Sequence, residues 1–179
     1  LKVQAASQQL VADLRDDRYR FKLDASRQGD QIELGDVAVQ AGAGRLNAHG
    51  TLSLADPNRF TLTGKLADFN PAEFGAYPAA QLTASFSGEG QLAPQPRGSV
   101  KLEIADSRFR RAPLSGQGSL SLSADRLWDV AVKLNLARSR LTWDASYQLD
   151  AALADRLTTV LSWQDSSALS DGQTRLQTL

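Results

Sequence analysis

The stretch Trp128–Leu136, WDVAVKLNL, alternates large apolar residues with polar or small ones. Its apolar members are Trp128, Val130, Val132, Leu134 and Leu136. Successive side chains of a β-strand point to opposite faces, so strict alternation indicates a strand with one apolar and one solvated face. This stretch therefore predicts a sheet whose two faces differ in polarity.

The same alternation recurs along the chain. It is found over 19–25, 46–54, 60–66, 100–104 and 141–149. Turn-forming residues separate these rows at short intervals, so we expect roughly ten to twelve strands. Parallel strands need crossover helices and usually read as continuous apolar runs, so the pattern favours antiparallel pairing.

One row contains a change of parity. In QIELGDVAVQ (31–40), Ile32 and Leu34 stand on one parity, and Val37 and Val39 stand on the other. One extra residue in a strand reverses the faces of all later residues, so we expect a bulge or a tight turn near Gly35. The row Val100–Ile104 likewise ends where the parity breaks, at Ala105 and Asp106.

A short helical turn is predicted at NPAEFGAYP (70–78). Asn70 is the expected N-cap, Pro71 the first helical residue and Glu73 the reciprocal cap. DSSALS (165–170) is a weaker counterpart.

Composition excludes several classes of protein. Twenty basic residues balance twenty acidic ones, so no overall basic character points to nucleic acid. The chain has no cysteine, which excludes disulfides and thiolate metal sites. No apolar run approaches the length of about 18 residues that a membrane-spanning helix needs. The chain begins at Leu1 and has no methionine, so we expect a fragment of a longer protein.

The tetrapeptide DVAV occurs at 36–39 and again at 129–132, an offset of 93 residues. Further along, Arg45 matches Arg140 at an offset of 95, and Asp68 matches Asp165 at 97. We interpret the drift as small insertions in loops. The sequence therefore predicts one elongated domain over 1–179, with approximate repeat units at 36–92 and 129–179.

The apolar rows need a cover, and the sequence shows no long amphipathic helix to provide one. The sheet can form a sandwich, close into a barrel, or curl into a trough with an apolar interior. Gly88 and Gly90, like Gly116 and Gly118, fall on the apolar parity, where missing side chains favour strong curling. We therefore expect an all-β fold: an elongated, curled antiparallel sheet (a β-taco) whose open groove is hydrophobic.

Such a groove suits acyl chains. Each buried methylene contributes about 0.8 kcal/mol, so a tail of about sixteen carbons gains on the order of 10 kcal/mol by leaving water. The expected lining residues are Leu52, Leu54, Phe60, Leu62, Leu82, Phe86, Val100, Leu102, Ile104, Leu120, Leu122, Trp128, Val130, Val132, Leu134, Leu136, Leu141 and Trp143.

An ordered series of motifs resembles the TamB family of AsmA-like proteins. The series comprises GRLNAHGTLSL, ADFNPAEFGAYP, LTASFSGEGQL, SRFRRAPLSGQGSLSL, SRLTWDASYQL and DRLTTVLSWQDSSALS, and it covers about 32–179. One departure is that Ser166 and Ser167 follow Asp165, where the first unit has Phe69, Asn70 and Pro71.

The resemblance implies a periplasmic segment of a long chain anchored in the inner membrane. It also implies a curled sheet with a hydrophobic interior that moves phospholipid toward the outer membrane. A further implication is work with TamA, an outer-membrane barrel, in assembling nascent outer-membrane proteins.

No residue pattern points to catalysis, and we expect no enzyme activity, cofactor or metal. His49, the single histidine, falls on the polar parity of its strand and is expected at the surface. The carboxylates are scattered, and solvated positions are expected for them. Arg108, Arg110 and Arg111 form the densest basic cluster, expected at a hairpin turn where a lipid headgroup or a partner could touch it.

Two other interpretations fit the alternation. A segment of a transmembrane β-barrel also alternates over about ten residues, although aromatic girdles are missing and strand lengths are irregular here. A purely structural β-repeat with a filled interior is the other. Uptake of lipid or a hydrophobic dye distinguishes such a scaffold from a trough.

Overall fold

The computed structural model describes residues 8–123, 127–148 and 156–165. These residues form eleven β-strands and one 3-10 turn, η1. The elements are β1 (Gln8–Arg15), β2 (Tyr19–Gln28), β3 (Gln31–Ala41), β4 (Gly44–Ser53), β5 (Arg59–Phe69), η1 (Pro71–Glu73), β6 (Ala80–Gln91), β7 (Arg97–Phe109), β8 (Ala112–Leu122), β9 (Leu127–Leu136), β10 (Ser139–Gln148) and β11 (Arg156–Gln164).

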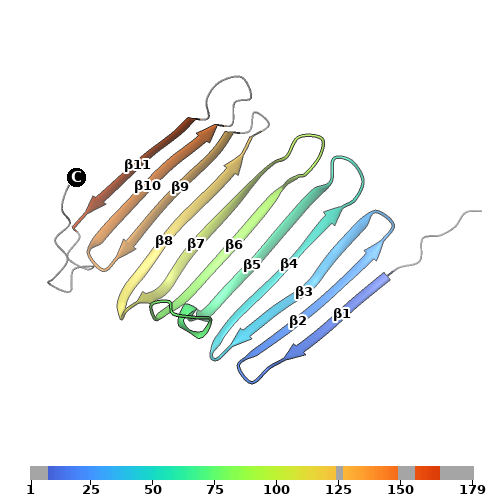
Figure 1. Cartoon of the computed structure of the whole chain (residues 1–179), viewed down its shortest axis with the longest axis horizontal. Helices are drawn as coiled ribbons and strands as arrows, with labels where there is room; N and C mark the ends of the chain where they lie inside the picture. The colour runs from blue at the N-terminus through green and yellow to red at the C-terminus, as the bar shows by residue number, and fades with distance from the viewer. Residues whose placement is uncertain (1–7, 124–126, 149–155, 166–179) are drawn as a thin grey trace, which may run out of the picture.

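All eleven strands belong to one antiparallel sheet in which every strand pairs with its neighbours in the sequence. Figure 1 shows the resulting elongated row of strands, with β1 and β11 at opposite ends. The prediction of an all-β, antiparallel, elongated fold is confirmed. The meander order follows from the short turns, because a short connection can join antiparallel neighbours only.

The hairpin turns use the residues that the sequence singled out. Arg110 and Arg111 link β7 to β8 with positive φ angles of 47° and 72°. Two successive positive φ values give the turn a twist that matches the twist of the flanking strands. The predicted hairpin position of the arginine cluster is therefore confirmed.

The registers keep the apolar parity on one face across the whole sheet. We call this face the apolar face and the opposite one the polar face. One continuous row of paired residues on the apolar face is Ala12, Leu23, Val37, Ala48, Gly64, Phe86, Leu102, Gly118, Val132, Trp143 and Leu161.

Apart from the connection between β5 and β6 at one end, no described element covers the apolar face. No large side chain in the described ranges is fully buried, and the buried apolar residues there are the small Ala41, Ala48 and Ala84. Larger apolar side chains of the central strands are mostly half-buried against their neighbours on adjacent strands, whereas those of β1 and β11 are mostly exposed. The sheet is thus a single layer that leaves apolar surface in contact with water.

Bulges appear where the parity breaks. The pairing of β3 with both neighbours shifts at Gly35, as predicted. A second shift falls between Ile104 and Ser107, beside Asp106 with a φ of 49°. There the Ser107 hydroxyl is buried and accepts from the Thr83 amide at 2.8 Å. Its oxygen lies 3.0 Å from the Ala105 and Thr83 carbonyls, which are alternative acceptors for its single hydrogen. Each bulge keeps the later apolar residues on the same face.

The two halves of the sequence repeat share one local detail. Gly44 and Ser139 each begin a strand and are buried. Gly44 lies 3.1 Å (ideal Cβ position) from the Asp68 carbonyl, and the Ser139 hydroxyl donates to the Asp165 carbonyl. Asp68 and Asp165 both have positive φ, 51° and 54°.

The change of the repeat offset from 93 to 95 residues does not arise in a loop. Two residues link β3 to β4, and two residues link β9 to β10, so these loops have equal length. The DVAV motif instead lies two residues farther from its turn in β9 than in β3. The change of offset from 95 to 97 falls at 149–155, which lies outside the described residues. The predicted counterpart turn DSSALS (165–170) also lies outside them, except for Asp165.

The predicted strong curling is wrong: the sheet is open and β1 does not approach β11 (Figure 1). The glycines do not thin the apolar face, because neighbouring side chains fill the space above them. A Cβ atom on Gly64 would overlap the Phe86 ring, and one on Gly90 would lie 2.9 Å from the Phe60 ring. An apolar face with bulky side chains resists folding inward.

The connection between β5 and β6 reaches back over the sheet. As predicted, Asn70 caps η1, and its side-chain oxygen accepts from the amides of Ala72 and Ala80, both at 3.2 Å. The expected reciprocal cap is replaced by contact between the Asn70 and Glu73 side chains at 3.5 Å. Asn70 thereby closes the whole loop, because it joins residues at both of its ends.

Phe74 anchors this loop at one end of the apolar face. Its ring stacks on Tyr19 of β2 at 5.3 Å and on Phe69 of β5 at 5.1 Å, measured between ring centroids. The Tyr19 hydroxyl also donates to the Glu73 carbonyl at 2.6 Å. The start of β2 and the segment 69–74, which are distant in the sequence, therefore meet at this aromatic cluster.

We expect Phe74→Ala to destabilise the loop by about 1 kcal/mol, because two ring contacts disappear. Limited proteolysis should then cut within 70–79 faster than in the parent chain. The matched control is Tyr77→Ala, since Tyr77 is 62% exposed and lies in the same loop. Equal cleavage of the two variants would show that the stacked rings do not hold the loop.

Candidate functional site

The structure places the predicted lining residues on the apolar face. All but one lie within β4 to β10; Leu54 follows the end of β4 and is exposed. Direct neighbours include Leu52 with Phe60, Phe86 with Leu102, and Leu120 with Val130. The prediction that they line a groove remains a prediction, because here they form an open surface.

The three tryptophans of the chain all lie on the apolar face. Trp128 pairs with Leu122, Trp143 with Val132 and Trp163 with Leu141. Their exposed fractions are 37%, 39% and 39%. The Trp143 indole also donates to the Thr159 hydroxyl at 2.9 Å, which fixes the ring across β10 and β11. The β9–β11 end of the face thus presents three large rings to solvent.

The polar face carries the hollow that sequence reasoning missed. This hollow has a volume of ≈ 840 Å³ and crosses β4 to β9. Smaller hollows beside it are also lined largely by polar-face residues. The central floor includes small side chains such as Ser85, Ser87 and Ser119.

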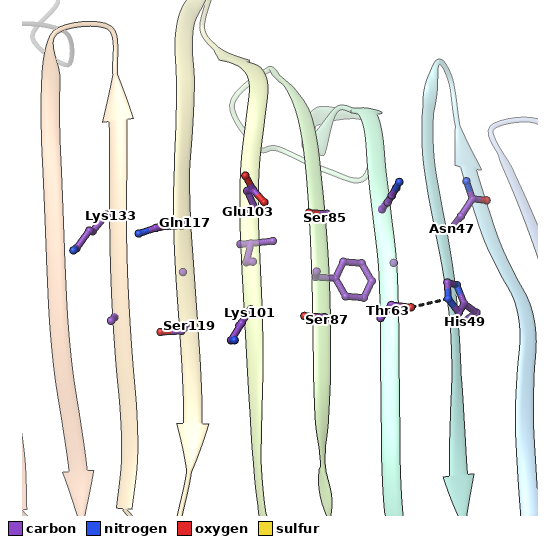
Figure 2. Close-up of a pocket in the computed structure, with 16 residues that line it drawn as sticks. Asn47, His49, Thr63, Ser85, Ser87, Lys101, Glu103, Gln117, Ser119 and Lys133 are labelled. Carbon is purple, nitrogen blue, oxygen red and sulfur yellow. Dashed lines mark hydrogen bonds between the residues drawn. The ribbon is translucent and has the colours of Figure 1, made fainter.

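Figure 2 shows the polar side chains that line the hollow. His49 is exposed, as predicted, and its Nε2 lies 2.8 Å from the Thr63 hydroxyl. Lys101, Glu103 and Lys133 come from β7 and β9. Elsewhere, Asp13 pairs with Arg15 and Arg20 at the β1 end, and the hydrogen bonds lower the pKa of this exposed carboxyl to about 2.

Within the described ranges, no three His, Cys, Asp or Glu side chains gather as metal ligands would. The part of the chain that the structure describes also has no helix with the length and apolarity to cross a bilayer. Comparisons with protein-family models, curated proteins and solved structures found no match. The chemistry of the two faces is therefore what carries a functional argument.

Proposed function

We propose that this chain is a TamB-like periplasmic segment whose apolar face shelters the acyl chains of phospholipid. The supporting observation is the apolar row that runs in register through all eleven strands and stays uncovered by the described elements. An acyl chain lying across this row would remove both its own methylenes and the exposed rings from water.

The apolar face suits a ligand that slides. Its contacts are non-directional, and neighbouring rows offer Leu, Val and Phe in similar positions. No headgroup chemistry is required on this face. The motif resemblance adds the setting: passage between the inner membrane and a TamA-like barrel, with phospholipid or a nascent outer-membrane protein as cargo.

The tryptophans provide a direct test. Phospholipid with brominated acyl chains should quench the emission of Trp128, Trp143 and Trp163, because heavy atoms would lie against their rings. The same lipid without bromine is the control. Equal emission with the two lipids would contradict the proposal. Stronger quenching by a lipid brominated only in its headgroup would also contradict it, because the headgroup rather than the acyl chains would then lie against the rings.

A further inference from the structure

The hollow on the polar face concentrates positive charge that the neutral composition conceals. Lys65, Lys101 and Lys133 line it, against the single carboxylate of Glu103. None of these three lysines has an ion pair or a side-chain hydrogen bond within the described ranges. Their ammonium groups are therefore available to a ligand.

Positive charge continues on both sides of the hollow. Arg20, Lys22 and Arg45 line the neighbouring depression over β2 to β4 together with Asp36, and Arg140 lines the one over β8 to β10. Arg20 is paired with Asp13, which leaves Lys22 and Arg45 as the cations of that depression without an ion pair in the part of the chain that the structure describes. Asp13 and Glu103 share the row of Lys22, Lys65 and Lys133. The other acidic residues of the polar face lie on the far side of that row, with Asp24, Asp36 and Asp144 in the row of Lys101, and Glu33, Glu89 and Asp129 one row beyond. The face thus carries a cationic band that crosses the strands.

The lysines of the hollow are regularly spaced. They stand on β5, β7 and β9, so successive lysines lie two strand spacings apart, roughly 10 Å across the sheet. Lys65 and Lys133 share one row with Glu103 between them, and Lys101 lies one row to the side. Between them lie hydroxyl and amide groups, including those of Ser85, Gln117 and Ser119. The six strands of the hollow span roughly 25 Å, which suits an extended chain better than a single small anion.

We propose that this hollow binds an acidic polysaccharide. Repeated anionic groups would pair with the lysines, while sugar hydroxyls would exchange hydrogen bonds with the serines and Gln117. The ring of Phe86 belongs to the apolar parity, so among the described polar-parity side chains that line the hollow the His49 imidazole alone could stack on a nucleic-acid base. This site goes beyond lipid shelter and lies on the opposite face.

The test uses the whole chain and an oligogalacturonate of defined length as the probe. Its methyl-ester form is the matched neutral ligand, because it keeps the sugars and loses the charges. The variant Lys65→Ser, Lys101→Ser, Lys133→Ser removes the hollow's cations. The control variant Arg59→Ser, Arg97→Ser, Arg156→Ser removes the same total charge outside the main hollow.

We expect the oligogalacturonate to bind and its methyl ester not to bind. The lysine variant should lose about tenfold in affinity, from three exposed charge pairs, whereas the arginine control should change by less than about twofold. Quenching of the tryptophans by brominated lipid should persist in the lysine variant, which separates this site from the apolar face.

Three results would overturn the proposal. Equal losses in the lysine and arginine variants would mean general attraction to net charge. Tighter binding of a single-stranded oligonucleotide than of the oligogalacturonate would assign the hollow to nucleic acid. Absence of binding at low ionic strength, where exposed charges attract most strongly, would leave the cationic band without a ligand of this class.

Discussion

Val132→Asp is expected to weaken phospholipid binding about thirtyfold. Val132 lies at the centre of the apolar row, between Gly118 of β8 and Trp143 of β10. A carboxylate there would have to lose water under an acyl chain without a partner, at a cost of about 2 kcal/mol. Titration with brominated lipid, followed by tryptophan emission, measures the change.

The adjacent Ala131→Asp is the matched control, because Ala131 belongs to the same strand and points to the polar face. It should bind lipid like the parent chain. Circular dichroism establishes that both variants keep the sheet. Adding Asp at Val130 and Leu134 should abolish binding altogether. Undiminished binding by a folded triple variant would exclude the apolar face as the lipid site.

Gly116→Ala is expected to lower the free energy of unfolding by about 2 kcal/mol. A Cβ atom at this position would overlap the Lys133 carbonyl of β9 and lie 3.1 Å from the Leu134 Cα. Both obstacles are backbone atoms, so β8 and β9 would have to move apart. Urea denaturation of the two chains measures the difference.

Gly118→Ala provides the comparison within the same strand and on the same face. A Cβ atom there meets nothing closer than 3.7 Å, the distance to a Val132 methyl. We expect the free energy of unfolding to stay the same or to rise by up to about 1 kcal/mol, because alanine restricts the unfolded chain. Similar losses at both positions would mean that β8 and β9 are not crowded at Gly116.

Local patterns predicted the strands, their pairing and their irregularities. The alternation in WDVAVKLNL is found in β9, and the parity change around Gly35 is found as a bulge. The NPAEFGAYP motif is found as a capped turn at Asn70. Each of these features depends on neighbours within a few residues, so the sequence alone contains the necessary information.

The absence of strong curling was not predictable in the same way. Curling depends on the difference in side-chain bulk between the two faces, summed over many strands. Gly64 illustrates the problem, because the Phe86 ring of the adjacent strand fills the space that the glycine leaves. The sequence shows a missing side chain, whereas the pairing register shows which ring replaces it.

The hollow was missed because net charge averages over the molecule. Lys65, Lys101 and Lys133 are far apart in the sequence, and each stands singly between apolar or glycine neighbours. Only the register brings them to two adjacent rows of one face. The sequence signal is one lysine at a polar-parity position in every second strand. It becomes readable only once the strands are assumed to pair in the order of the chain.

The meander has a consequence for how this molecule tolerates change. Each strand contacts mainly the strands directly before and after it. Stability is therefore close to a sum of nearest-neighbour terms, as in a linear array of coupled units. Hairpins can be added or removed with little disturbance to distant ones, which gives evolution a simple means of adjusting the reach of the whole ribbon.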